Sequence, residues 1–119
     1  MTKRGLIMEK LIEIDGKKIP FKATAGTVRR YRSAFGRDLM LDMKKLVTEY
    51  QKGENMDKLS LEIFENVAFV MAKHADDTIP NNPDEWLDGF NMFSIWEVLP
   101  QIIELWQVQQ MPLNELKKK

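Results

Sequence analysis

The 119-residue sequence contains no cysteine, which excludes disulfide bonds, thiol nucleophiles and thiolate metal ligands and is typical of proteins in a reducing cytoplasm. No uncharged apolar run approaches the roughly 20 residues that a membrane span requires, and the N-terminal residues MTKRGLIMEK lack the apolar core of a secretion signal. The glycines are too widely separated to form a phosphate-binding loop. We therefore expect neither a membrane anchor nor a nucleotide site.

The sequence contains a single histidine, His74. Asp76 and Asp77 follow it, but a metal site needs further converging ligands, and no such spacing is present. We expect His74 to lie near a helix C-terminus, whose dipole favours a cation. The seven-residue spacing of Glu97 and Glu104 indicates a solvated acidic stripe. No serine lies in a nucleophile-elbow sequence, so we predict no catalytic residue, no cofactor and no metal, and a protein that is not an enzyme.

Length and composition indicate one soluble globular domain. Hydrophobic residues make up 44% of the chain and charged residues 30%. We predict an α+β fold, mainly α, in which an N-terminal β-hairpin at about residues 7–24 packs on a bundle of four to five helices at about residues 25–110. We expect residues 1–112 to form the domain and residues 113–119 to form a flexible tail ending in lysines.

The hairpin prediction depends on Asp15-Gly16, a pair typical of two-residue turns. This turn places Ile12 opposite Ile19 and gives one mostly apolar face. It also places two opposite-charge pairs on the other face, namely Glu13 with Lys18 and Glu9 with Lys22. Pro20 then falls at a position without a ladder hydrogen bond, which indicates a sheet edge.

Two helices should follow the hairpin. Thr24 or Thr27 can cap the first helix, which Gly36 ends, and Asp38 can cap the second, which Gly53 ends. Apolar residues at helical spacing predict the inward faces, formed by Val28, Tyr31 and Phe35 in the first helix and by Leu39, Met43, Leu46, Val47 and Tyr50 in the second.

The second half of the chain predicts three more helices. The first begins at Ser60, and its apolar centre at residues 64–72 is typical of the most buried helix. Asn82-Pro83 predicts the start of a short helix reaching about residue 91. A last helix spans about residues 94–110 before Met111-Pro112, and Pro100 should kink or divide it.

The aromatic last third offers two interpretations. Core packing accounts for most of the tryptophans and methionines. If Trp96 or Trp106 is exposed instead, the last helix becomes a partner-binding surface, and we name Trp96, Ile103 and Trp106 as candidate partner-binding residues.

Charge is distributed unevenly along a chain of zero net charge. Residues 1–52 hold 13 basic and 6 acidic side chains (+7), residues 53–116 hold 2 and 12 (−10), and the three terminal lysines restore balance. The halves can neutralise each other within the fold. Alternatively, copies associate through opposite faces, or the acidic face receives a basic partner.

Arg29, Arg30 and Arg32 form the densest basic cluster and surround Tyr31. Aromatic and basic residues together are common in nucleic-acid-binding segments. Tyr31 is predicted to face inward, however, and the sequence pI is near 6.6. We therefore favour a solvated or protein-facing basic ridge and name the three arginines as candidate contacts to a partner.

Three segments together resemble one protein family, the tail assembly chaperones of long-tailed, non-contractile phages and prophages of Gram-positive bacteria. They are IDGKKIPFKAT at residues 14–24, RRYRSAFGRDL at residues 29–39 and WLDGFNMFSIWEVLPQIIELW at residues 86–106. The segments occur in the expected order and span most of the chain, and none is a catalytic signature.

The resemblance implies a non-enzymatic protein that binds the tape measure protein, keeps it soluble and helps to recruit tail-tube protein. It implies action in the cytoplasm of the bacterial host and absence from the mature virion. Many such phages make a second, longer product by ribosomal frameshifting, and the codons of Lys117 to Lys119 are rich in adenine, as slippery sites often are.

Two other functions stay open. The arginine cluster fits a small nucleic-acid-binding regulator, which would bind DNA in a salt-dependent manner. A minor structural protein, such as a tail-completion subunit, would instead be present in purified virions.

Overall fold

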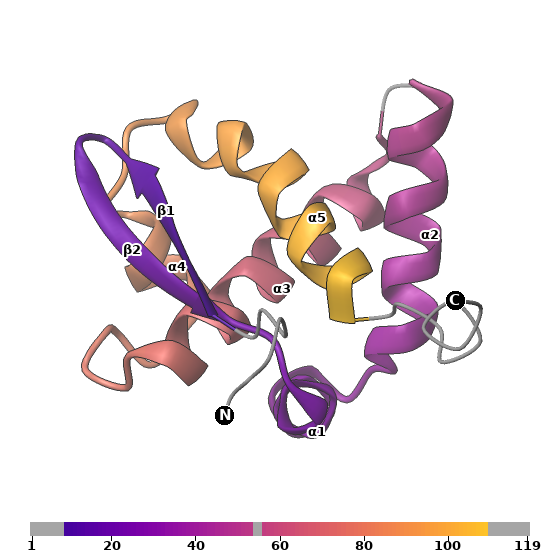
Figure 1. The fold of residues 1–119 in the computed structure, drawn as a ribbon, viewed down its shortest axis with the longest axis horizontal. Coiled ribbons are helices and arrows are strands. Elements are labelled where there is room, and N and C mark those ends of the chain that lie inside the picture. Colours follow the sequence, from indigo (N-terminus) through magenta and orange to yellow (C-terminus); the bar gives the residue numbers. More distant parts are fainter. Residues whose placement is uncertain (1–8, 54–55, 110–119) are drawn as a thin grey trace, which may run out of the picture.

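The computed structural model describes residues 9–53 and 56–109, which form a two-stranded antiparallel sheet and a set of helices (Figure 1). The predicted α+β, mainly helical class is confirmed. In chain order the elements are β1 (Glu9–Ile14), β2 (Lys17–Lys22), α1 (Ala25–Phe35), α2 (Leu39–Lys52), α3 (Lys58–Ala75), α4 (Pro83–Leu87), the 3-10 helix η1 (Ser94–Val98) and α5 (Leu99–Gln109). Among these helices, none combines the length and the apolar character that crossing a membrane requires.

The hairpin has the register that its turn predicts. Asp15 and Gly16 both have positive φ, 53° and 79°, as a two-residue turn of the mirror-image type requires. Ile12 pairs with Ile19, Glu13 with Lys18 and Glu9 with Lys22. The inner face is buried on the helices through Ile12, Ile14 and Phe21, whereas Leu11 on the outer face is 61% exposed.

Capping residues define α1 and α2. Thr24 is the N-cap of α1, and its hydroxyl accepts a hydrogen bond from the Gly26 amide. Asp38 caps α2 by accepting from the Met40 amide at 2.8 Å. Gly36 and Gly53 end the two helices in the left-handed conformation.

The inner stripe predicted for α2 is wrong at its last position. Leu39, Met43 and Leu46 are fully buried, but Tyr50 is 40% exposed. Tyr50 lies in the last turn of α2, which reaches the edge of the molecule (Figure 1).

The central helix is α3, whose Phe64 and Val67–Ala72 are all buried between the hairpin and the other helices. It begins at Lys58, so the predicted start at Ser60 is two residues late. Asp57 caps the helix instead, because its carboxylate accepts the Ser60 amide at 2.8 Å.

The chain after α3 departs furthest from the predicted boundaries. Asn82 and Pro83 begin α4 as expected, but the helix ends at Leu87 rather than near residue 91. The Gly89 and Phe90 amides bond three residues back, and the Asn91 amide bonds to the Asp15 side chain, so the helical ladder cannot continue.

Pro100 divides the last predicted helix into η1 and α5. The proline occupies the first turn of α5, where its missing N–H costs no intrahelical bond. The predicted stop at Met111-Pro112 and the predicted tail at residues 113–119 lie outside the described residues.

Candidate protein-docking groove

The residues predicted to bind a partner fall into two separate groups. Ile103 and Trp106 on α5 are buried, with 3% and 6% of their surface exposed. Trp96 on η1 is half-buried and stacks on Phe64, with ring centroids 5.1 Å apart. The sequence predicted a partner-binding surface on the last helix if Trp96 or Trp106 were exposed, and Trp106 is not exposed. The partner-binding role of these residues stays a prediction.

The basic cluster lies on α1, at the start of the helical part of the fold. Arg29, Arg30 and Arg32 are all exposed, whereas Tyr31 between them is fully buried. The inward direction of Tyr31 confirms the predicted face of this helix. Arg30 borders the hollow beside His74, whereas Arg32 borders a hollow with Gly36 and Met40, so these two arginines lie on different sides of α1 and not on a single ridge.

An apolar groove of about 370 Å³ lies between α2 and α5, and we call it the α2–α5 groove. Trp106 contributes the largest side chain and lies at the bottom, because little of it is exposed. On the α2 wall, Met40 and Leu41 are 49% and 66% exposed. The full lining consists of Met40, Leu41, Met43, Lys44, Val47, Thr48 and Trp106.

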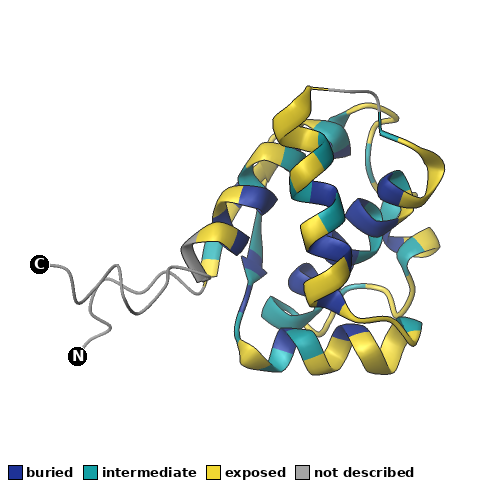
Figure 2. Cartoon of the chain, turned by 90° about the vertical axis from the view of Figure 1, so that its right-hand side faces the viewer, coloured by how far each residue is buried: buried dark blue, intermediate teal, exposed yellow. Residues whose placement is uncertain are grey.

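The start of α2 explains why these apolar side chains face solvent. Once Asp38 caps the helix, Leu39 turns into the core with Met43 and Leu46. Helical geometry then places Leu41, Lys44 and Thr48 on the outward side. Figure 2 views the molecule from the α2 side and shows exposed turns along the helices there. Helical periodicity alone did not predict this site, although the run Leu39-Met40-Leu41 was a signal, since one helix face cannot bury all three.

A second depression continues the groove toward α1. It also measures about 370 Å³ and is lined by Val28, Arg32, Gly36, Arg37, Asp38 and Met40. Met40 borders both hollows, so they form one surface that runs from α1 along α2. The structure therefore brings Arg32 and Trp106, two of the predicted contact residues, to the same extended surface.

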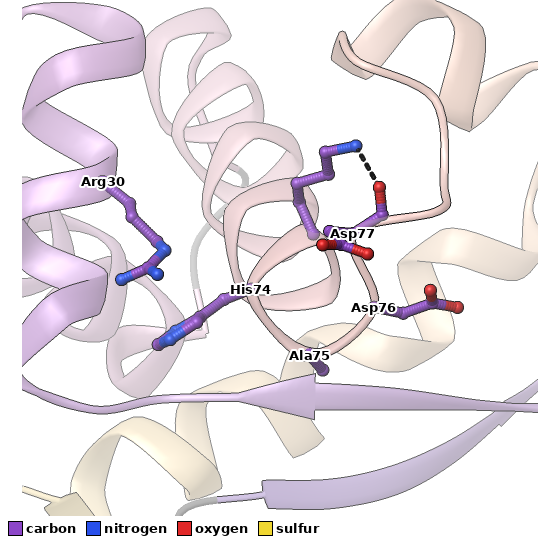
Figure 3. Close-up of a pocket in the computed structure, with 6 residues that line it drawn as sticks. Arg30, His74, Ala75, Asp76 and Asp77 are labelled. Atoms are coloured by element: carbon purple, nitrogen blue, oxygen red, sulfur yellow. Dashed lines mark hydrogen bonds between the residues drawn. The ribbon is translucent and has the colours of Figure 1, made fainter.

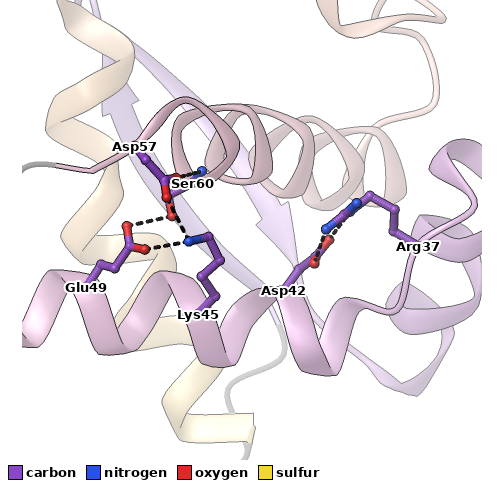
Figure 4. Close-up of polar contacts among 6 residues, drawn as sticks. All are labelled: Arg37, Asp42, Lys45, Glu49, Asp57 and Ser60. Atoms are coloured by element: carbon purple, nitrogen blue, oxygen red, sulfur yellow. Dashed lines mark hydrogen bonds and ion pairs between the residues drawn. The ribbon is translucent and has the colours of Figure 1, made fainter.

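Asp42 fixes the corner between α1 and α2 (Figure 4). The Arg37 guanidinium donates two hydrogen bonds of 2.7 Å to this carboxylate, and the Tyr31 hydroxyl donates a third of 2.8 Å. Burial would raise the pKa of Asp42, but these hydrogen bonds outweigh it and lower the pKa below its ordinary value. Burial and the bond to Asp42 raise the pKa of the Tyr31 hydroxyl well above its ordinary value.

A second polar network holds the other end of α2 (Figure 4). Lys45 donates to Glu49 at 2.6 Å and to Asp57 at 2.9 Å, and the Ser60 hydroxyl donates to Glu49 at 2.6 Å. Hydrogen bonds from Lys45 and Ser60 lower the pKa of Glu49. Because both ends of α2 are tied to neighbouring elements, one wall of the groove is held in place.

The charge of the groove is positive. Arg37 is neutralised by Asp42, but among the described residues no carboxylate pairs with Arg32 or Lys44. The surface therefore combines exposed apolar side chains with these two cations and one exposed carboxylate, that of Asp38, which accepts the first amides of α2. Such a surface suits an amphipathic segment with acidic residues beside its apolar face.

The histidine lies in a different hollow, of about 520 Å³, between α1 and the end of α3 (Figure 3). Its Nδ1 is 3.3 Å from the Thr27 hydroxyl. Burial and the nearby charges of Arg30 and Lys22 lower the pKa of His74. His74 lies in the last turn of α3, as expected.

The polar groups around this hollow are engaged in hydrogen bonds of their own. The Lys73 ammonium is occupied by the Asp77 and Ile79 carbonyls, both at 2.8 Å. The hydroxyls of Ser60 and Ser94 donate to Glu49 and Asp15, away from His74. In residues 9–53 and 56–109, no three side chains among His, Asp and Glu gather as ligands of a metal ion would.

Comparison with known proteins found no family model, no curated protein and no solved structure that matches this chain.

Proposed function

We propose that this protein is a non-enzymatic assembly chaperone that binds an amphipathic helical segment of a partner protein in the α2–α5 groove. The observation that carries the proposal is the exposed apolar wall of Met40 and Leu41 above Trp106, with Lys44 beside it. A groove of this kind accepts the apolar face of a helix. The flexible thioethers of Met40 and Met43 allow it to adapt to different sequences.

The resemblance of three segments to phage tail assembly chaperones gives the proposed partner its identity. We propose that the partner is the tape measure protein, a long chain that needs protection before the tail tube surrounds it, and that tail-tube protein is recruited to the same complex. The protein would act in the cytoplasm of the bacterial host and leave before the virion is complete. Mass spectrometry of purified virions that detected the chain in stoichiometric amount would support the structural tail protein instead.

Co-expression with the tape measure protein tests the function and the groove together. Wild-type chaperone should keep the tape measure protein in the soluble fraction and co-purify with it. Changing Met40→Gln together with Leu41→Gln should reduce the co-purified tape measure protein by about tenfold, since two apolar contacts are lost.

The matched control is Leu11→Gln, which alters a leucine of similar exposure on the hairpin, 61% against 66% for Leu41. It should leave co-purification unchanged. If the wild-type chain does not retain the tape measure protein, the proposed function is wrong. If Leu11→Gln and the groove variant behave alike, the groove is not the binding site.

A further inference from the structure

A second apolar feature lies far from the groove, in the turn between α4 and η1. Met92 and Phe93 are 77% and 69% exposed, more than the other large apolar side chains of the described residues. Both lie on one short turn that projects two large side chains into solvent. We call these two residues the knob.

The knob is held by the hairpin. The Asp15 carboxylate accepts the Asn91 amide at 2.8 Å and also the Ser94 hydroxyl, one bond on each side of the knob. The Phe93 amide further bonds to the Asn91 side chain at 3.4 Å. A turn that is already fixed loses less conformational entropy on binding than a flexible turn, which favours this turn as a binding surface.

The knob and the α2–α5 groove complement each other in shape and charge. The knob projects from the surface, and the exposed carboxylates Asp88 and Glu97 lie four residues before and after it in the sequence. The groove is concave, apolar and bordered by Lys44. Arg32 adds a second cation on the hollow that continues it, where Arg37 is paired with Asp42 and the Asp38 carboxylate caps α2.

One molecule cannot make this contact with itself. The knob is bonded to the hairpin turn, and Figure 1 places that turn and α2 at opposite ends of the longest axis. A second copy can present its knob to the groove without any rearrangement. Charge pairing within one molecule is incomplete. Only two of the four ion-pair contacts in the described residues join the basic half of the chain, residues 1–52, to the acidic half, residues 53–116. Other charged side chains of the two halves can therefore interact with a second copy.

We propose that the Met92–Phe93 knob of one copy docks into the α2–α5 groove of another copy. The contact uses different surfaces on the two molecules, so it repeats head to tail and forms chains or rings. Two projecting side chains bury less area than a stable dimer needs, so association is weak and depends on concentration. It does not depend on the identity of any other partner, and a helix bound in the groove would displace the knob.

Sedimentation velocity on the full chain, without any partner protein, tests this contact. We expect the weight-average mass of the wild type to rise above that of the monomer between about 10 μM and 1 mM. The knob variant Met92→Gln with Phe93→Gln and the groove variant Met40→Gln with Leu41→Gln should each stay monomeric. All four side chains are exposed, so both variants should keep the far-ultraviolet circular dichroism of the wild type.

A mixture of the two variants gives the decisive experiment. The groove variant retains the knob and the knob variant retains the groove, so a 1:1 mixture should form a heterodimer that does not grow further. Leu11→Gln serves as control and should associate like the wild type. A wild type that stays monomeric at about 1 mM would overturn the proposal, as would a mixture without heterodimer or a control that also dissociates. Because no tape measure protein is present, such a failure would leave the proposed function to its own test.

Discussion

Asp42 is the residue on which the corner between α1 and α2 depends. Its carboxylate is 7% exposed and accepts three hydrogen bonds, from Arg37 and Tyr31. Replacing it with asparagine removes the charge and leaves the Tyr31 hydroxyl and the guanidinium poorly matched.

We expect Asp42→Asn to lower the free energy of unfolding by about 2 kcal/mol, a modest value because Arg37 is 43% exposed and keeps part of its hydration. Urea denaturation monitored by circular dichroism measures the loss. Asp77→Asn, at an exposed aspartate, is the control and should be nearly neutral. Equal stability of the two variants would show that the corner does not depend on Asp42.

His74 predicts a loss of stability in weakly acidic solution. Its pKa is lowered in the folded state, first by burial and then by Arg30 and Lys22, while Glu9 acts in the opposite direction. The unfolded chain therefore binds the proton more readily. The stability due to neutral His74 is complete above its ordinary pKa of about 6.5 and is lost as the pH falls toward the lowered value.

Thermal melts between about pH 7.5 and 5 should show this decline for the wild type, and His74→Gln should flatten it. Glu65 acts in the opposite sense, because burial and the neighbouring Glu62 and Asp84 raise its pKa. Its contribution is present at low pH and is lost as the pH rises through the raised value. A wild-type melting temperature that rises on acidification through this range would mean that Glu65 outweighs His74.

At the scale of elements, the hairpin and the turn after α4 act as one unit. Asp15 has a left-handed backbone conformation in the hairpin turn and accepts bonds from both ends of residues 91–94. These bonds lower the pKa of Asp15, the Ser94 hydroxyl contributing most. A residue chosen for hairpin geometry thus also positions the knob.

Asp15→Ala should accelerate hydrogen exchange of the Asn91 amide by about tenfold or more, because that amide loses its acceptor. Exchange measured by NMR on the full chain reads this directly. Asp15→Asn keeps an acceptor oxygen and tolerates positive φ, so it should retain most of the protection. Unchanged exchange in Asp15→Ala would show that the turn is fixed without the hairpin.

At the scale of the whole molecule, charge asymmetry and apolar exposure act together. The knob has acidic neighbours, whereas the groove has Lys44 and its extension has Arg32. Oppositely charged surfaces attract more weakly as salt screens them.

We therefore expect the self-association constant to fall severalfold between about 0.05 M and 0.5 M sodium chloride. Sedimentation velocity at fixed protein concentration measures this change. The double variant Arg32→Gln with Lys44→Gln should associate more weakly at low salt and respond little to added salt. Association that strengthens with salt in the wild type would show that apolar contact alone drives it.

The parts of this fold that depend on neighbours a few residues away are encoded locally and could be predicted. Asp15-Gly16 defines the hairpin register, and Asp38 and Asn82 begin their helices, because turns and caps satisfy backbone groups within three residues. The buried centre of α3 was equally readable, since almost every side of that segment is apolar.

Which apolar residues remain exposed depends instead on how the elements pack together. Periodicity could not reveal that Trp106 would lie beneath Met40 and Leu41, because α2 and α5 are about fifty residues apart in sequence and their packing creates the groove. The path of the chain after α4 likewise involves Asp15, a residue far along the chain, because Asp15 accepts the Asn91 amide. Turns and caps define the individual helices and strands. The exposure of a side chain depends on which elements pack over it. In this protein the proposed contacts use apolar side chains that no other element covers.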